Sequence, residues 1–592
     1  MPDRAPSYKK GDRLTLSVTD LTASGEGVAH AGGLACFVKD AVPGDEVQAT
    51  VTKVKSRLLY AHLDRIITPS PDRITPPCPV AKVCGGCQIQ ALSYSASLTW
   101  KDRLVRQALI RIGSFTEEAL QEVMLPIAGA QEAAAGAGKD EPAGIYRYRN
   151  KAQLPVAADK DGRPAAGFFA ARSHRVIPVT DCLLTDPVFS DITAMVLSHM
   201  EERRIPAYNE LDGTGVVRHL LIRRGHHSGE IMVCIVLYTG PVGDAESIDA
   251  DKLMPYVTAG FPGAEELADV LFAGIPGMRS LSFDLNPAAG NVILSPLLVP
   301  FRGEPRIVDE MCGLHFALSP LSFYQVNTPQ AERLYEQAMA FAALTGKEEV
   351  IDLYCGIGTI SLLAATRARH VTGVEIIPAA TRDAQDNALR NDIDNADFIT
   401  GKAEEVLPRM AADGSHPDVL IVDPPRAGLD PSCIEAILTL APSRIVYISC
   451  NPSTLARDLK LLTARPEDPS APLYALTKAR AFDLFPQTGH VETVVLLTQR
   501  KPDMSIEITM DEKDLELTRA EAKATYKEIT NYVQNKFGLH VNNLYVAQVK
   551  REFGIIEREN YNKGKEGHHI PQVTPEKREA IIDALRFFKM IG

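Results

Sequence analysis

The clearest pattern along the chain is a change of hydrophobic period near residue 320. From there to about residue 500, short apolar runs typical of buried strands alternate with stretches whose apolar residues recur at helical spacing. The apolar runs include VIDLYCG, VTGVE, VLIVDPP and RIVYISC. This alternation predicts an α/β domain over residues 311–503, a Rossmann-like, doubly wound fold with a mainly parallel sheet.

Two β-rich regions precede this domain. Residues 1–67 contain short strands separated by glycines, which is typical of a small antiparallel, OB-like β-barrel. Residues 68–310 begin with a cysteine cluster and continue as a second, central β-rich domain. Within it, residues 128–144 are rich in alanine and glycine and predict a surface insertion.

Basic residues alternate with other residues in both β-rich regions. Lys53, Lys55 and Arg57 form one such set. The segment YRYRNK at 146–151 forms a second set, in which tyrosines are interleaved with the cations. Since alternate residues of a strand share a face, each set is expected on one face. Cations beside aromatic rings are typical of single-stranded nucleic-acid surfaces, although solvated strand faces also carry such patterns.

The last segment, residues 504–592, has apolar positions at helical spacing and predicts a small helical extension. It contains equal numbers of basic and acidic residues, so it is not a basic tail. A helix-turn-helix-like module that contacts RNA or the ribosome is one interpretation, and a helical appendage without such a role is the other.

Composition places the chain among globular proteins of several domains. Its 592 residues carry a formal net charge of −12 and contain no run of eighteen apolar residues, so no membrane span is expected. The N-terminus lacks the apolar core of a signal peptide, and we expect a cytoplasmic protein. Ten cysteines in such a chain are expected to be free, catalytic or metal-bound.

The strand ends of the α/β domain predict an adenosine-containing cofactor. Gly356, in the turn after the first strand, allows a close backbone approach to a ligand. Glu375 ends the next strand, where a carboxylate can accept hydrogen bonds from both ribose hydroxyls. This turn has fewer glycines than the fingerprint that binds a dinucleotide, which favours an adenosine cofactor without a pyrophosphate, such as S-adenosylmethionine. Asp423 ends the fourth strand, and Arg426 follows its two prolines where amino-group methyltransferases often have a tyrosine.

A cysteine follows the next strand, at the same edge of the sheet. Cys450 precedes Asn-Pro and a helix start, where a helix N-terminus favours the thiolate. A thiolate that adds to C6 of uracil makes C5 nucleophilic toward a methylsulfonium, and a base must then remove the C5 proton. Glu492, at the start of the last strand, is the candidate base.

At this point the sequence resembles the RNA uracil-C5 methyltransferase family, in particular its bacterial 23S ribosomal RNA branch. The resemblance covers residues 8–500 and is carried by SFYQVN, DLYCGIG, GVE, DPPRAGL, YISCNPSTLARD and FDLFPQTGHVET, in that order. It implies that the N-terminal barrel is a TRAM domain that binds RNA. It also implies roles in binding S-adenosylmethionine for Gln325, Tyr354, Glu375 and Asp423, in nucleophilic attack for Cys450, and in proton abstraction for Glu492.

The cysteine cluster predicts a metal centre. Cys78, Cys84 and Cys87 have a C-x5-C-x2-C spacing, and Cys182 is the best candidate for a fourth ligand. The spacing alone leaves zinc and iron–sulfur open. The family resemblance implies a 4Fe–4S cluster.

The leading hypothesis is therefore a monomeric enzyme that methylates C5 of an unpaired or flipped-out uridine in 23S ribosomal RNA. Transfer RNA is the alternative substrate for the same chemistry. A different class of function is a non-catalytic RNA-binding protein with a redox-responsive cluster, which the set of Asp423, Cys450 and Glu492 disfavours.

Overall fold

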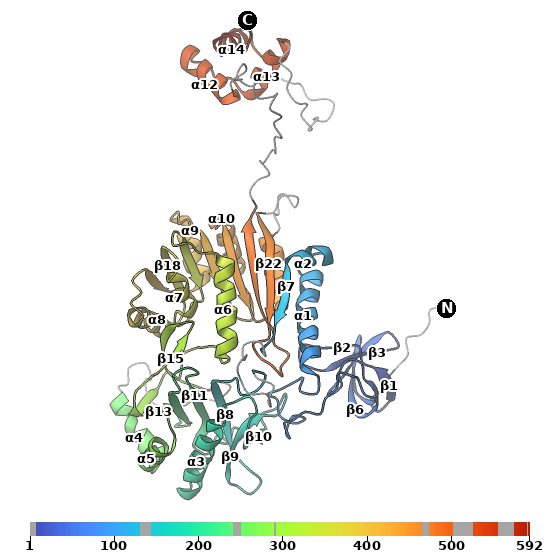
Figure 1. The fold of residues 1–592 in the computed structure, drawn as a ribbon, viewed down its shortest axis with the longest axis vertical. Helices are drawn as coiled ribbons and strands as arrows, with labels where there is room; N and C mark the ends of the chain where they lie inside the picture. Colours follow the sequence, from blue (N-terminus) through green and yellow to red (C-terminus); the bar gives the residue numbers. More distant parts are fainter. Residues whose placement is uncertain are drawn as a thin grey trace. The chain divides into compact units, whose positions relative to one another are not determined.

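The computed structural model describes residues 8–130, 144–240, 250–288, 290, 292–463, 473–500, 525–553, 573–588 and 590–591. The chain divides into two compact units, Met1–Arg500 and Lys501–Gly592 (Figure 1). Most of the expected surface insertion at 128–144, and residues 504–524 of the expected helical extension, lie outside the described residues. Within the described ranges, no helix is long and apolar enough to cross a membrane.

The first unit begins with a six-stranded sheet of strand order β1-β5-β6-β4-β3-β2. Adjacent strands are antiparallel except for β4 and β6, which are parallel. Alternate residues of β5 enter a small apolar core, as the sequence predicts. The strands are β1 Arg13–Ser17, β2 Asp20–Leu21, β3 Gly27–Ala31, β4 Leu34–Val38, β5 Glu46–Val54 and β6 Leu58–Thr68.

A helical segment connects this sheet to the rest of the unit (Figure 1). It comprises α1 Tyr94–Arg111 and α2 Glu117–Val123, followed by β7 Met124–Ala128. The Trp100 indole N–H of α1 donates to the carbonyl of Leu21 at 3.4 Å, and Arg103 pairs with Asp20. These contacts dock the small sheet on α1.

The central domain is a seven-stranded sheet of order β10-β9-β8-β11-β12-β13-β14, mainly antiparallel, with β12 and β13 parallel. Helices α3, α4 and α5 contribute to its apolar core. The elements are β8 Lys151–Ala158, β9 Pro164–Phe169, β10 Val176–Pro178, α3 Val188–Glu202, β11 Val217–Arg224, β12 Ile231–Leu237, α4 Ala250–Gly260, α5 Ala264–Gly274, β13 Met278–Leu285 and β14 Leu298–Gly303.

The expected Rossmann-like domain is confirmed as an eight-stranded sheet of order β19-β18-β17-β20-β21-β23-β22-β7. Its elements are the hairpin β15 Ile307–Met311 and β16 Leu314–Leu318, then α6 Thr328–Ala342, β17 Glu349–Leu353, α7 Thr359–Ala365, β18 His370–Glu375, α8 Pro378–Arg390, β19 Ala396–Thr400, α9 Ala403–Ala412, β20 Val419–Val422, α10 Pro431–Leu440, β21 Arg444–Ser449, α11 Pro452–Leu462, β22 Tyr474–Phe482 and β23 Glu492–Gln499.

This sheet separates two apolar cores. Val419 and Ile421 of β20 face the core that includes α6 and α7, whereas Leu420 and Val422 face the core that includes α1, α10 and α11. Strands β17 to β21 are parallel, so their carboxyl ends meet at one edge. That edge is where open α/β sheets bind ligands.

The second unit is helical, with α12 Tyr526–Phe537, α13 Asn543–Glu552 and α14 Pro575–Phe587 around its own apolar core. A capping box of Thr525 and Glu528 begins α12, and Gly538, with φ of 67°, ends it. A helical extension was expected here.

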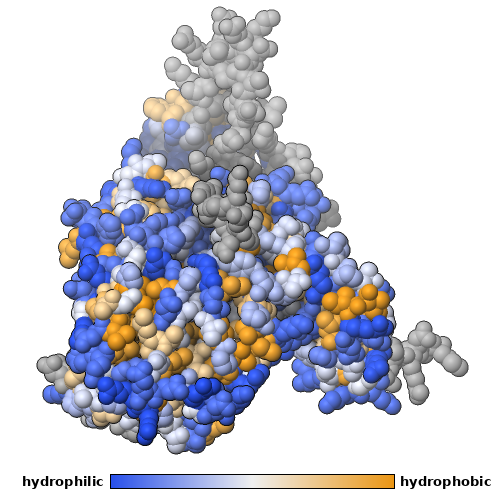
Figure 2. Space-filling view, turned by 60° about the horizontal axis from the view of Figure 1, so that its bottom comes forward, coloured by the Kyte–Doolittle hydropathy of each residue, from blue (hydrophilic) through white to orange (hydrophobic). Residues whose placement is uncertain are grey.

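Neither set of alternating basic residues shares a strand face, which corrects two expectations. Lys53 belongs to β5, but Lys55 and Arg57 lie in the turn that follows. Arg147 has a left-handed backbone with φ of 53° and pairs with Asp181. Alternation predicts a common face only inside a regular strand, and both sets extend into turns. Across the face shown in Figure 2, hydrophilic side chains surround several apolar areas.

Candidate active site

The turn after β17 and the end of β18 border an open space at the carboxyl edge of the sheet, which we call the recess. The Gly356 N–H donates to Oε2 of Glu375 at 3.0 Å, and the Ile377 N–H donates to Oε1 at 2.8 Å. Glu375 is therefore held in place, and each oxygen keeps a free lone pair for a hydroxyl. A Cβ built on Gly356 would meet no atom within 4 Å, so open space lies in front of this turn. These features fit an adenosine ribose.

Asp352, which the sequence analysis missed, lies at the base of the same recess. Its Oδ2 accepts a hydrogen bond from the Ser361 hydroxyl at 2.5 Å, whereas its buried Oδ1 has no partner among the described residues. Burial, together with the charges of Asp423 and Glu375, raises its pKa to about 7. Because this oxygen is buried, Asp352 can favour a nearby positive charge electrostatically but makes no direct contact with a ligand in this conformation. The sequence feature that could have revealed Asp352 is an acidic residue inside an otherwise apolar strand.

Two further expected cofactor residues, Tyr354 and Gln325, are held by hydrogen bonds of their own. Tyr354 has a left-handed backbone with φ of 67°, rare for a residue with a bulky side chain, and its hydroxyl bonds to Cys433. Gln325 is buried, and its carbonyl accepts from the Asn150 side chain at 2.8 Å. The Gln325 side chain also bonds to Tyr335 of α6, a buried residue that sequence reasoning missed. The sequence signal for Tyr335 was limited to its position on the apolar face of a helix.

Cys450, Asp423 and Glu492 come together at the same edge. Cys450 follows β21, Asp423 follows β20, and Glu492 begins β23, which pairs with β21. Burial, and next the charge of Asp423, raise the pKa of Glu492 to about 8, while Arg426 acts to lower it. Burial also raises the pKa of Asp423 to about 7. The carboxyl of Glu492 can therefore act as a base near neutral pH.

The thiol of Cys450 is not activated in the way that the sequence predicts. Burial, and next the charges of Glu492 and Asp423, raise its pKa to about 11, while Arg426 acts to lower it. The helix N-terminus alone does not outweigh burial and two nearby carboxylates. Unliganded Cys450 is consequently a protonated thiol at neutral pH.

Helix α11 fixes Arg426 beside this thiol. The carbonyl of Arg426 accepts from the Asn451 side chain at 3.1 Å and from the Thr454 hydroxyl at 3.2 Å. Asn451 is also the N-cap of α11 and directly follows Cys450. These bonds hold the backbone of Arg426, and the charge of its exposed side chain acts on both the nucleophile and the candidate base.

The four predicted metal ligands line one cavity of about 300 Å³ with mainly apolar surroundings. Cys84 and Cys87 lie near Cys78 and Cys182, whose charges raise the pKa of both thiols after the larger effect of burial. However, in the described ranges no three His, Cys, Asp or Glu side chains are arranged to hold a metal ion. The thiol set suits a soft metal. The four thiols would have to move closer together to bind one metal centre, so the cluster stays a prediction.

Comparisons with known proteins identify the family to which the chain belongs. Residues 312–500 match the family model described as tRNA (Uracil-5-)-methyltransferase, and residues 8–63 match the TRAM domain. An uncharacterized RNA methyltransferase of Halalkalibacterium halodurans is 39% identical over 497 residues, which cover 84% of this chain and 99% of that protein. One from Clostridium tetani is 36% identical and covers 83% of this chain and 97% of its own length.

A solved structure is similar over the same extent. It is the Pyrococcus abyssi tRNA (uracil-54, C5)-methyltransferase in complex with S-adenosyl-L-homocysteine. It shares 25% identity with this chain at a TM-score of 0.61, and the match covers 82% of this chain and 99% of that one. With its TRAM domain and its S-adenosylmethionine-dependent Rossmann-like domain, the chain belongs to the RNA uracil-5-methyltransferase family.

Proposed function

We propose that this enzyme methylates C5 of an unpaired uridine in 23S ribosomal RNA through a covalent adduct between Cys450 and C6 of the base. The observation that carries the proposal is the convergence of the Cys450 thiol with the carboxyl groups of Asp423 and Glu492. They meet at the sheet edge that also holds Glu375 and Gly356. A thiol, a base and a recess for the cofactor at one edge are what uracil-C5 methylation requires.

The proposed reaction uses these groups in order. The Cys450 thiol gives its proton to the Asp423 carboxylate beside it, the resulting thiolate adds to C6, and the electron pair of the C5–C6 double bond moves toward O4 to give an enolate. S-adenosylmethionine supplies the methyl group, which C5 takes. Glu492 then removes the remaining C5 proton, the double bond re-forms, and the sulfur–carbon bond breaks to release the Cys450 thiolate. Arg426 stabilises the thiolate and the negative charge of the enolate beside it.

The choice of RNA rests on the resemblance to the ribosomal branch. The N-terminal domain and the cysteine segment do not by themselves decide it. A tRNA methyltransferase aligns over 82% of this chain, well beyond the catalytic domain. Transfer RNA is therefore the second candidate substrate, favoured by that neighbour and by the description of the matching family model.

A single mapping experiment separates the two substrates. We expect 5-methyluridine at one or more 23S positions to disappear when the gene is deleted and to return with the wild-type gene but not with Cys450→Ala. Loss confined to transfer RNA would select the second substrate. Unchanged 5-methyluridine in both RNAs would refute the proposed activity.

We further propose that Cys78, Cys84, Cys87 and Cys182 hold a 4Fe–4S cluster, with a structural role. Their thiols line one cavity, and thiolates are the ligands such clusters use. Protein purified without oxygen should be brown and contain iron and acid-labile sulfide. Cys84→Ser should lose both, whereas Cys312→Ser, outside the cavity, should keep them. Colourless, zinc-loaded protein would reject the iron assignment.

All groups in this mechanism come from one chain, so we propose that the active form is a monomer. Light scattering of the purified enzyme should give a single-chain mass at concentrations that support activity. A dimer that loses activity on dilution would contradict this.

A further inference from the structure

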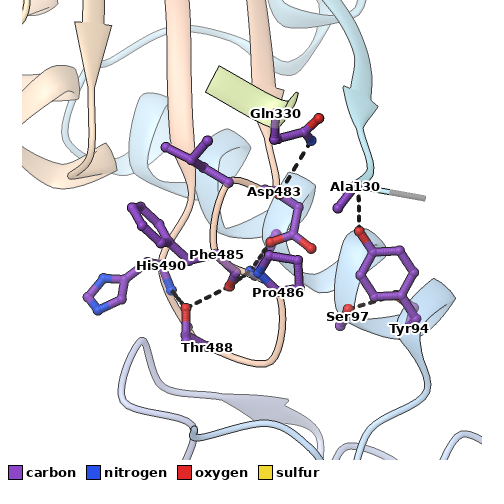
Figure 3. Close-up of polar contacts among 12 residues, drawn as sticks. Tyr94, Ser97, Ala130, Gln330, Asp483, Phe485, Pro486, Thr488 and His490 are labelled. Carbon is purple, nitrogen blue, oxygen red and sulfur yellow. Dashed lines mark hydrogen bonds and ion pairs between the residues drawn. The ribbon is translucent and has the colours of Figure 1, made fainter. Parts of the chain in front are cut away.

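The loop that leads to Glu492 is held by an unbroken series of hydrogen bonds. It connects β22 to β23 over residues 483–491. Five consecutive carbonyls each accept a hydrogen bond from a residue outside the loop, and Figure 3 shows part of this network. The pairs are Gln330 side chain to Asp483 (3.3 Å), Asn327 side chain to Leu484 (2.9 Å), Lys101 ammonium to Phe485 (3.1 Å), Tyr148 hydroxyl to Pro486 (3.0 Å) and Gln88 N–H to Gln487 (3.0 Å).

An ion pair anchors the start of the loop. Lys101 and Asp483 are both fully buried, with Nζ and Oδ1 2.5 Å apart. At the other end, the Thr488 hydroxyl donates to the Phe485 carbonyl at 2.7 Å and accepts from the His490 N–H at 3.3 Å. The loop backbone is therefore fixed by the protein itself and does not need RNA to order it.

Most of this loop is buried, but it carries two accessible rings. Phe485 is half-buried and His490 is exposed. Their centroids lie 6.1 Å apart with the planes at 76°, an edge-to-face pair, and Figure 3 shows the two rings next to each other. His490 precedes Glu492 by two residues, with buried Val491 between them, so the exposed ring lies in the last turn of chain before the candidate base.

The surroundings of His490 suit a nucleotide. Partial desolvation lowers its pKa, and the charges of Arg426, Lys101 and Arg149 lower it further, so the imidazole is neutral at pH 7. A neutral ring flanked by guanidinium groups offers a stacking surface with cations for the adjoining phosphates. An imidazolium would instead compete with those arginines for phosphate.

We propose that Phe485 and His490 form a platform on which a base next to the target uridine stacks, so that the flipped uracil lies over Cys450 and Glu492. The platform rests on the proposed uridine methylation and extends it to a recognition element of the RNA. Its ligand is an unpaired base, because only an unstacked base exposes its face to a ring. Since stacking tolerates every base, the platform selects strand conformation more than sequence.

A double-mutant cycle tests this with nonamer RNAs centred on the mapped uridine. Affinities are measured by fluorescence anisotropy in a Cys450→Ala background, with intact nonamers and with nonamers abasic at one flanking position. His490→Ala should weaken binding of the intact RNA roughly 5- to 150-fold, the range for loss of one stacked base. One of the abasic nonamers lacks the base that stacks on the platform, and His490→Ala and its parent should bind that RNA with equal affinity. His490→Phe should keep most of the affinity, and Tyr256→Ala, an exposed aromatic of α4, should change nothing.

Two results would overturn the platform. One is an intact nonamer bound as tightly by His490→Ala as by its parent. The other is additivity, in which His490→Ala weakens binding of every abasic nonamer by the same factor as it weakens binding of the intact nonamer. The proposed reaction is judged separately, with wild-type enzyme and nonamers that carry 5-fluorouridine at the target. Absence of a covalent adduct there defeats the covalent mechanism, while the anisotropy cycle still decides the platform.

Discussion

Replacing Lys101 by methionine should destabilise the first unit severely, because Asp483 would be left charged and alone. Both side chains are fully buried, and Asp483 Oδ2 has no partner among the described residues, so Lys101 alone compensates this carboxylate. Removing one member of such a pair costs about 3–5 kcal/mol. Burial lowers the pKa of Lys101 and Asp483 raises it, so the pair works as a unit.

The single tryptophan provides the assay. Trp100 is adjacent to Lys101, is buried, and bonds to Leu21 of the small sheet, so its fluorescence reports unfolding of this region. With a urea slope of about 3 kcal/mol/M, the midpoint for Lys101→Met should fall by about 1–1.7 M. The matched variant is Lys101→Met with Asp483→Leu, which removes both charges and should recover most of the midpoint. An unchanged midpoint in the single variant, or no recovery in the double variant, would refute this reasoning.

The other predictions concern the chemistry. Cys450→Ala should bind S-adenosylmethionine but give no turnover, and retained turnover would remove the thiol from the mechanism. Glu492→Gln should accumulate a methylated covalent RNA adduct on denaturing gels; a fully active variant would exclude Glu492 as the base. Because the base must be ionised and its pKa is raised to about 8 in the empty site, the rate of adduct release should fall with decreasing pH, with a break below 8 by as much as the bound cofactor lowers that pKa; a flat profile between pH 5 and 8 would contradict it. Glu375→Ala should weaken S-adenosylmethionine binding by calorimetry at least tenfold, since it loses two hydrogen bonds, and unchanged binding would remove Glu375 from the ribose. Cofactor affinity should also fall as the pH drops below 7, because protonated Asp352 and Asp423 no longer favour its positive charges; affinity independent of pH would show that neither carboxyl acts on the cofactor.

The sequence predicts which candidate residues lie at one edge of the sheet, because parallel strands share that edge. Gly356, Glu375, Asp423 and Cys450 each follow or end an apolar run, and a parallel sheet must bring such positions together. Glu492 joins them because its strand pairs with the one before Cys450. No geometric detail beyond strand order was needed for this part of the prediction.

Other features were hidden because they depend on tertiary contacts. Lys101 and Asp483 lie 382 residues apart in the chain, and a lysine in a helix ordinarily indicates solvent. Tyr148 was expected to stack on RNA, but its ring is buried and its hydroxyl holds the loop before Glu492. The thiol of Cys450 was expected to be activated, and burial reverses that expectation. Burial and partnership decide these roles, and neither can be read from local pattern.

The raised pKa values of Asp352, Asp423 and Glu492 share a cause that ties cofactor binding to catalysis. Each carboxyl is buried, and Asp423 acts on both of the others, so bringing all three to full charge without a counterion is unfavourable. The cofactor brings a sulfonium and an ammonium to this edge. Their positive charges favour ionised carboxylates, so binding lowers these pKa values and releases protons. Under the mechanism that we propose, cofactor binding therefore ionises Glu492 before methyl transfer, because its pKa of about 8 keeps most of it protonated at neutral pH in the empty site.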